Sequence, residues 1–133
     1  MREIKFRVWN KKRKKMIYKP EFDDDIEEGY AIKNNGELIK YADMDYYPSI
    51  EELNDDNFKL MQYTGRMDKN QKEIYKNDIL KFVYDNLRFK GIVRYNKNKA
   101  QYIIYCEDGK FGFDIIQKVK VIGNNYENPE LLE

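Results

Sequence analysis

Alternating apolar and polar positions run through most of the chain, and they predict short β-strands. Near the start, EIKFRVW places Ile4, Phe6 and Val8 on one face and Lys5 and Arg7 on the other. This period of two is typical of a strand with one buried face. We therefore expect a half-buried strand over these residues.

Turn signals then divide the first half of the chain into hairpins. The charged segment NKKRKKM (residues 10–16) predicts a turn into a returning strand that Pro20 ends. The segment YAIKNNGELIKY (30–41) holds Asn-Asn-Gly between two apolar runs, which predicts a second hairpin because the turn needs positive φ. EFDDDIEEGY (21–30) has too few apolar residues for a core element, so we expect an exposed loop.

A helix is predicted at only one place. Ser49 and Glu52 have the spacing of a capping box, in which the serine accepts a bond from a free backbone N–H and the glutamate reaches back. A short helix over 49–57 should follow, ending in a run of poor helix formers.

The second half of the chain is more regular. Polar separators, among them the turn dipeptide Asp108-Gly109, divide four apolar runs, and Gly91 stands where a strand would bend around a small barrel. The runs cover residues 78–84, 91–95, 101–106 and 117–122. Short strands at this spacing, with little room for helices, favour a small antiparallel barrel.

The predicted fold class is therefore mainly β (α+β). Residues 1–58 are expected to form an N-terminal β-hairpin lobe with an acidic loop and one short helix. Residues 59–133 are expected to form a small SH3-like antiparallel barrel. A single compact unit of both parts is the alternative.

Charge is strongly segregated along the chain, although the net charge is only +1. Residues 1–20 carry nine basic residues and one acid, whereas residues 21–58 carry thirteen acids and two lysines. The two segments could screen one another, or each could be a patch for an oppositely charged partner.

The composition argues against an enzyme. The chain has no histidine, which removes the commonest general base and metal ligand, and its single cysteine excludes a structural zinc site of the usual kind. We expect Cys106 to be an inert core thiol, because no histidine is present to activate it. Gly109 and Gly112 lack the context of a phosphate-binding loop. No catalytic residue, metal site or cofactor is predicted.

No secretory leader or membrane-spanning run is found, so a cytoplasmic location is expected, without membrane association. The oligomeric state is left open, and a homo-oligomer is compatible with the sequence.

Three segments carry a resemblance to a known family: MREIKFRVWNKKRKKMIY at the start, LMQYTGRMDKNQKEIYKNDIL in the middle and VIGNNYENPELL at the end. Together they resemble the YopX family of bacteriophage and prophage proteins. The chain departs from the family at Arg66-Met67 and at Gln71, where a Leu-Lys pair and a glycine are more usual. The resemblance implies an origin and a fold, and location in a host cell during infection or lysogeny, rather than an activity.

The resemblance also implies a structural role for residues 60–80. Leu60, Met61 and Tyr63 would form a strand that leads to a turn at Gly65. A second turn at 68–72 would precede the first barrel strand. The final segment would wrap back, with Tyr126 and Leu131 as apolar anchors and Pro129 breaking regular structure.

Two non-enzymatic functions remain. The hypothesis favoured by the sequence is a phage accessory protein that binds a host or phage protein, such as a counter-defence inhibitor. Its contact would be the acidic run, namely Asp23, Asp24, Asp25, Glu27 and Glu28.

The alternative is a small nucleic-acid-binding protein that uses the basic turn at 11–15. Phosphate contacts and a stacking ring would come from Trp9, Lys11, Lys12, Arg13, Lys14 and Lys15. The near-neutral net charge weighs against this alternative.

Overall fold

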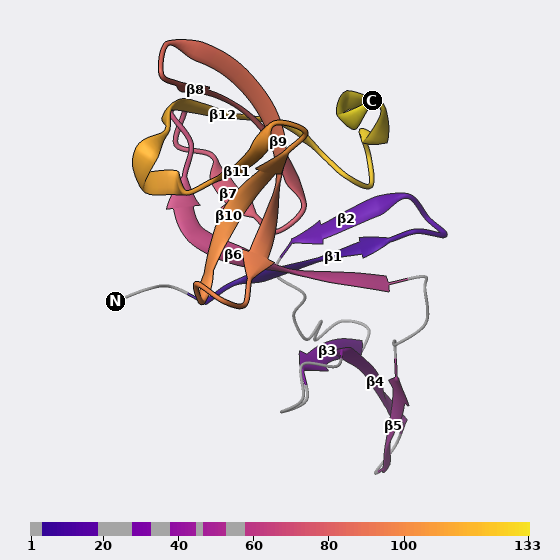
Figure 1. The fold of residues 1–133 in the computed structure, drawn as a ribbon. Helices are drawn as coiled ribbons and strands as arrows, with labels where there is room; N and C mark the ends of the chain where they lie inside the picture. The colour runs from indigo at the N-terminus through magenta and orange to yellow at the C-terminus, as the bar shows by residue number, and fades with distance from the viewer. Residues whose placement is uncertain (1–3, 19–27, 33–37, 45–46, 53–57) are drawn as a thin grey trace. The chain divides into compact units, whose positions relative to one another are not determined.

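The computed structural model describes residues 4–18, 28–32, 38–44, 47–52 and 58–133; for 28–58 it describes the backbone only. The described residues are almost entirely antiparallel β-structure (Figure 1). Contacts divide the chain into two units, Lys5–Leu60 and Met1–Ile4 with Met61–Glu133, which are described separately below.

The unit of Lys5–Leu60 begins with a hairpin of β1 (Phe6–Asn10) and β2 (Lys15–Tyr18). Their register pairs Val8 with Ile17 and Asn10 with Lys15, which confirms the predicted returning strand. The one-sided burial predicted for β1 is wrong: Ile4 precedes the strand and is 70% exposed, whereas Arg7 is buried.

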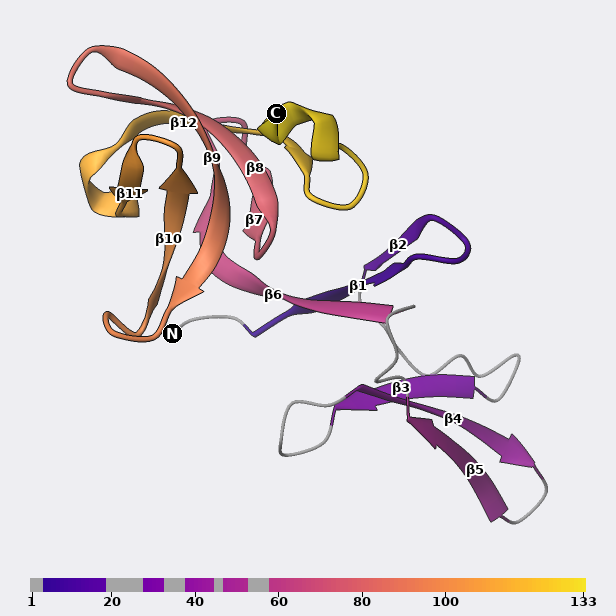
Figure 2. The same cartoon turned by 45° about the vertical axis from the view of Figure 1, so that its right-hand side comes forward.

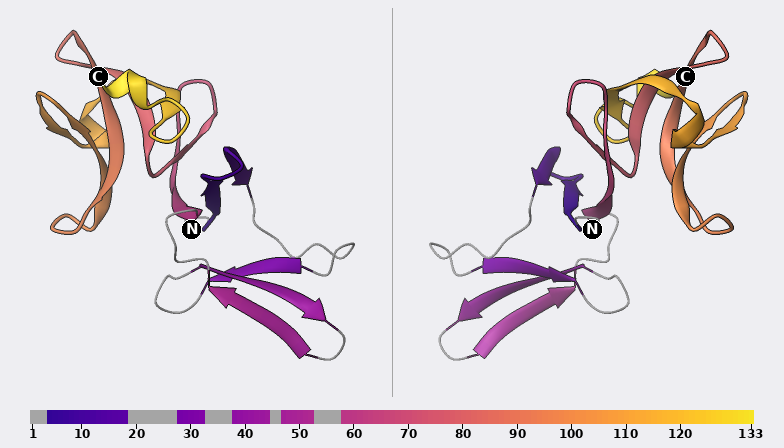
Figure 3. Two further views of the ribbon diagram at one scale, coloured as in Figure 1. Left: turned by 90° about the vertical axis from the view of Figure 1, so that its right-hand side faces the viewer. Right: turned by 90° about the vertical axis from the view of Figure 1, so that its left-hand side faces the viewer.

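The same unit contains a three-stranded antiparallel sheet in the order β3-β4-β5, with its strands side by side in Figure 2 and Figure 3. Its strands are β3 (Glu28–Ile32), β4 (Leu38–Met44) and β5 (Tyr47–Glu52). The β3–β4 pairing confirms the predicted hairpin strands, while its turn, residues 33–37, lies outside the described residues.

Two sequence-based predictions fail in this sheet. The acidic loop predicted for 21–30 does not extend to its last residues, because Glu28 begins β3. The helix predicted over 49–57 is also wrong: Ser49 and Glu52 lie in β5, where Ser49 pairs with Ala42 of β4. Residues 53–57 lie outside the described part of the chain.

The other unit is built on a five-stranded antiparallel sheet in the order β11-β10-β9-β8-β12, curved into a half-barrel. The strands are β8 (Asp78–Tyr84), β9 (Leu87–Asn96), β10 (Gln101–Cys106), β11 (Gly109–Phe111) and β12 (Gln117–Asn124). Four of them confirm the four apolar runs of the sequence, and β11 is the return from the Asp108-Gly109 turn.

Two strands precede this sheet, and two single 3-10 turns complete the unit. They are β6 (Phe58–Met67), which starts in the first unit, β7 (Glu73–Tyr75), η1 (Phe113–Ile115) and η2 (Pro129–Leu132). β6 does not end in a turn at Gly65 as predicted. It continues to Met67, and Gly65, with φ of 86°, lies at a register shift between β6 and β7.

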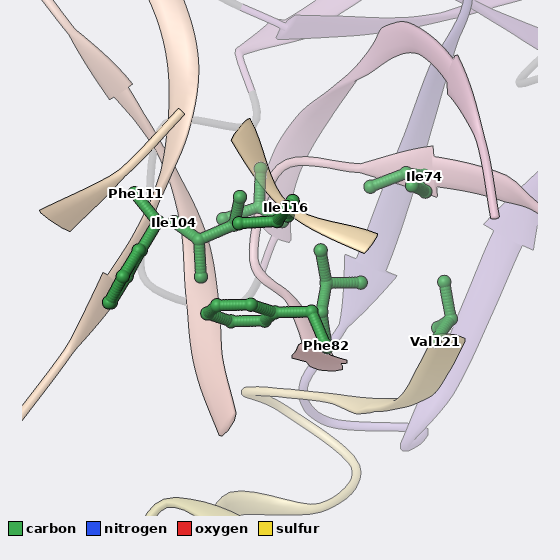
Figure 4. Packing of buried hydrophobic residues seen from close by; sticks show 8 residues of the cluster. Ile74, Phe82, Ile104, Phe111, Ile116 and Val121 are labelled. Carbon is green, nitrogen blue, oxygen red and sulfur yellow. The ribbon is translucent and has the colours of Figure 1, made fainter. Parts of the chain in front are cut away.

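One apolar cluster fills the concave side of the sheet. Its buried members are Ile74, Leu80, Phe82, Val93, Ile104, Phe111, Ile116 and Val121 (Figure 4). The ring centroids of Phe82 and Phe111 are 5.2 Å apart, and those of Phe89 and Phe111 are 4.9 Å apart. This aromatic centre supplies the large buried area that a short β-sheet needs for stability.

Candidate functional site

The loop at 68–72 is held to the sheet by one carboxylate. Asp68 Oδ1 accepts bonds from the backbone N–H groups of Asn70 (2.8 Å) and Lys72 (2.9 Å), while Oδ2 accepts from Val121 of β12 (2.9 Å). The Lys69 N–H also donates to the Val119 carbonyl at 2.8 Å. The loop is therefore a structural clamp between β6–β7 and β12.

Two opposing effects act on the pKa of Asp68. Burial raises it, but the three backbone N–H bonds and the nearby charge of Lys72 lower it by more. The pKa therefore lies below its ordinary value of 3.8, and the side chain is a carboxylate at neutral pH. Its acceptor positions face backbone donors, which suits an anchor rather than a general acid.

The next turn, at Asn77-Asp78, ties three segments together. Asn77 is buried with φ of 73°, a left-handed conformation that asparagine tolerates well. Its N–H donates to the Val93 carbonyl of β9 and its own carbonyl accepts from Asn125, both at 2.9 Å. Asp78 Oδ2 accepts from the Tyr75 N–H at 2.8 Å.

Asparagine side chains fold the C-terminal segment. Asn124 Oδ1 accepts from the N–H groups of Tyr126 (3.0 Å) and Glu127 (2.9 Å), and Asn128 donates its N–H to the Asn124 carbonyl at 2.9 Å. Pro129 does not break regular structure as predicted but opens the η2 turn, where its missing N–H has no cost. The central and C-terminal sequence motifs are thus architectural.

The acidic run that the sequence favoured as a partner contact is almost wholly outside the described residues. Asp23, Asp24, Asp25 and Glu27 fall in the range 19–27, and only Glu28 is placed, as the first residue of β3. The run stays a prediction from sequence.

The basic turn is closed and exposed. Lys11, Lys12, Arg13, Lys14 and Lys15 are all exposed at the end of the β1–β2 hairpin. Asn10 Oδ1 accepts from the Arg13 N–H at 3.1 Å, which closes the turn, and Lys14 has φ of 53°. The turn therefore presents five consecutive cationic side chains to solvent.

Trp9 does not belong to this exposed group. Its side chain is only 7% exposed, because it lies in β1 rather than at the turn. A buried indole cannot stack on a base, so the stacking role considered for Trp9 does not fit the structure.

Cys106 is half-buried against the core cluster, so it is less deeply buried than expected. Burial, with a smaller effect from the charge of Asp108, raises the pKa of its thiol to about 11. A thiol of this pKa is almost entirely protonated at neutral pH, which makes it a poor nucleophile.

A metal site needs clustered ligands, and a membrane-spanning helix needs a long apolar stretch. Within the described ranges, no group of three or more His, Cys, Asp and Glu side chains is placed to hold a metal ion. No helix in the same ranges is long and apolar enough to cross a membrane.

Sequence reasoning missed a second basic feature, which lies on the half-barrel. Lys120, Lys81 and Lys90 are far apart in the sequence but occupy paired positions on β12, β8 and β9. The only signal in the sequence is that each of the three strands has a lysine between apolar neighbours. Strand register, which the sequence does not give, is what brings the three together.

Two solved structures are similar to this protein in fold. The protein EF1440 from Enterococcus faecalis matches with 26% identity and a TM-score of 0.57, covering 100% of both chains. The protein yopX from Bacillus subtilis matches with 21% identity and a TM-score of 0.64, covering 100% of this chain and 98% of the other. No curated protein gave a match.

A comparison of the sequence with family models also finds a match. The model described as YopX protein matches residues 5–133, which includes both units of the structure. The anchors at Asp68, Asn77 and Asn124 account physically for the central and C-terminal segments that carried the resemblance. The chain therefore belongs to the YopX family.

Proposed function

We propose that this protein is a non-enzymatic binding protein that contacts nucleic acid through the basic turn of its β1–β2 hairpin. The observation that supports this function is the exposure of five consecutive cationic side chains, Lys11–Lys15, on a closed turn. This reverses the order of the two hypotheses reached from sequence, because a closed turn that exposes five consecutive cations is suited to phosphate contacts.

The turn is suited to phosphate contacts rather than to base recognition. Lysine and arginine side chains that neutralise phosphates release condensed counterions, which gives binding that is independent of sequence and sensitive to salt. With Trp9 buried, the hairpin tip offers no ring for stacking. Contacts to phosphate alone position a protein on nucleic acid without reading its bases.

The absence of catalysis is part of the proposal. The chain has no histidine, Cys106 has a raised pKa, and Asp68 is occupied by backbone donors. None of these groups has the matched pKa and free geometry that general acid–base or nucleophilic catalysis needs.

The experiment measures binding of a fluorescent duplex and a single strand at several salt concentrations, starting at about 50 mM, where nonspecific contacts are favoured. The turn variant replaces Lys11, Arg13 and Lys14 with glutamine. We expect weaker binding and a salt slope smaller by about 0.9 for each lost duplex contact, hence by about 2.7 in total.

A charge-matched variant separates a local contact from the loss of net charge. It replaces Lys69, Lys97 and Lys99, which are exposed in other turns, with glutamine. Both variants should melt like the parent. Equal effects of the two variants, or no binding by the parent at low salt, would refute the proposed contact.

A protein partner is the second candidate, supported by the thirteen acids against two lysines in residues 21–58. In this alternative the protein is a phage accessory factor, and Asp23, Asp24, Asp25, Glu27 and Glu28 contact a host or phage protein, for instance to inhibit a defence nuclease. Replacing the three aspartates with asparagine should then slow association, since charges at the rim of an interface mainly steer encounter.

A pull-down from host lysate, with and without nuclease, separates the two functions. Capture of one protein in stoichiometric amount after nuclease treatment, lost in the triple asparagine variant, would favour the second candidate. Nucleic acid that disappears on nuclease treatment would favour the first.

A further inference from the structure

Three lysines form a row across the middle of the half-barrel. Lys120 of β12 pairs with Lys81 of β8, and Lys81 pairs with Lys90 of β9. The three strands are hydrogen-bonded neighbours and lie side by side in Figure 1 and Figure 2. Since neighbouring strands are about 4.8 Å apart, the lysine row spans about 10 Å.

All three side chains lie on the face of the sheet opposite the core. Leu80 and Phe82, on either side of Lys81, belong to the buried cluster, so the period of two places Lys81 on the other face. The same holds for Lys90, between Phe89 and Gly91, and for Lys120, before Val121. The lysine row is exposed along its whole length.

Within the described part of the chain, the positive charge of the lysine row is not neutralised by a paired acid. Apart from the backbone ladder, no side-chain hydrogen bond or ion pair links Lys81, Lys90 or Lys120 to another described residue. The nearest acids along the chain are Asp78, which is buried at the start of β8 and accepts the Tyr75 N–H, Asp85 in the β8–β9 turn, and Asp114 before β12. Asp85 and Asp114 are exposed to solvent.

Like charges at directly opposite positions of an antiparallel pair destabilise the sheet. Lys81 takes part in two such pairs, one with Lys120 and one with Lys90. The arrangement therefore raises the free energy of the folded protein, and no structural contact of the three side chains offsets this cost. An anion bound across the lysine row would remove this repulsion. Local conflicts of this kind are expected where a surface serves binding.

The next pairs along the strands show which anion fits. On one side of the row, Gln117 pairs with Val83 and Val83 with Arg88, which adds one exposed cation to the same face. On the other side, Ile92 pairs with Tyr105, whose half-buried ring already has the Lys110 ammonium over it at 5.3 Å and is therefore not open for stacking. Single-stranded nucleic acid is usually held by stacking on rings, whereas the backbone of a duplex needs only a spaced set of cations.

We propose that the lysine row Lys120–Lys81–Lys90, extended by Arg88, binds the phosphate backbone of double-stranded nucleic acid without base recognition. This surface is a second contact on the unit Met61–Glu133, separate from the basic turn at 11–15. It rests on the proposed function, since it names a duplex as the form of nucleic acid that the protein binds.

The test replaces Lys81, Lys90 and Lys120 with glutamine and measures binding of a fluorescent DNA duplex of about 20 base pairs against salt. We expect a higher Kd and a salt slope smaller by about 2.7, corresponding to three lost phosphate contacts. The variant with Lys69, Lys97 and Lys99 replaced is the control with equal net charge, and it should keep the slope of the parent.

Folding is checked by melting. Because two like-charge pairs are removed, the row variant should melt at the temperature of the parent or above it. A row variant that binds duplex with the Kd and slope of the control variant would overturn the inference.

The turn variant from the proposed function is measured in the same series, so the two contacts can fail separately. If the turn variant loses binding and the row variant keeps it, the lysine row is not a contact while the proposed function stands. The opposite result supports the lysine row and refutes the turn. Absence of duplex binding by the parent at low salt overturns both.

Discussion

At the scale of single residues, the most informative side chains are those that hydrogen-bond to the backbone of the protein itself rather than to a ligand. Asp68 satisfies three N–H groups from two parts of the chain, and Asn77 joins β9 to the C-terminal segment. Both residues supply hydrogen-bond partners to backbone groups that lie outside the regular strands and would otherwise be unpaired. The conspicuous central motif is therefore explained by hydrogen-bond satisfaction.

Replacing Asp68 with asparagine should lower the free energy of unfolding by about 1.5–3 kcal/mol at neutral pH, the usual value for bonds to a charged acceptor. The pKa of Asp68 is depressed in the folded protein, so its stabilisation is present above 3.8 and is lost as the pH falls through the folded value. Denaturant titrations should therefore show the parent and the variant converging below about pH 4.

Glu107→Gln is the control for this prediction, since Glu107 is an exposed carboxylate on the same unit. A constant difference between the Asp68 variant and the parent from pH 7 to pH 3 would contradict the role assigned to the carboxylate.

The backbone conformation at Gln71 shows why glycine is more usual at this position in the family. Its φ is 67°, a left-handed conformation that glycine adopts without strain, and its N–H donates to the Asp68 carbonyl at 3.0 Å. Gln71→Gly should raise stability by about 0.5–1 kcal/mol, the relief of strain less the greater chain entropy of glycine. A lower melting temperature for this variant would show that the side chain makes a stabilising contact.

Gly91 is required for close approach, not for an unusual φ. A Cβ at this position would lie 2.6 Å from Ile104 Cγ2 and 2.7 Å from the Tyr105 carbonyl oxygen. Gly91→Ala should therefore cost about 1–3 kcal/mol by overpacking. At Gly112 an added Cβ meets only the end of the Asp114 side chain, so Gly112→Ala is a suitable control. Equal melting temperatures for the two variants would contradict this assignment.

At the scale of elements, pairing overrides local preference. The capping box at 49–52 favours a helix by about 1 kcal/mol, and a helix of nine residues is marginal in water. β5 instead pairs along six residues with β4, and its Pro48 is tolerated because β5 is an edge strand of the sheet. The non-local partner, which a local motif does not reveal, decided this element.

The C-terminal segment is stabilised by side-chain amides as well as by backbone hydrogen bonds. Asn124→Ala removes the acceptor of two N–H bonds and should cost about 1–2 kcal/mol. Hydrogen exchange at the amides of Tyr126 and Glu127 should accelerate, with little change in the amides of β8 and β9. Unchanged exchange at these two amides would show that Asn124 does not hold the segment.

At the scale of the whole molecule, the chain is mainly β and belongs to the YopX family. Its two units are Lys5–Leu60 and the remainder of the chain. The likeness of the C-terminal unit to SH3 barrels stays a prediction, as does a cytoplasmic location.

The sequence by itself determined the four main strands of the half-barrel, although not the full length of β9 or the short strand β11. Period-two runs such as DILKFVY and turn residues such as Asp108-Gly109 are local signals, and they predicted β8 and β10 with correct ends. The family segments and the exposed basic turn at 11–15 were also readable, because they depend on composition and on short spacing alone.

Only the tertiary structure decided the features that depend on register and on distant partners. The burial of Arg7 and Trp9, the strand at Ser49 and the clamp from Asp68 to Val121 each require knowledge of what lies opposite. The lysine row is the clearest case. Its members are separated by up to 39 positions in the sequence, and antiparallel pairing of three strands is the physical cause that brings their charges together.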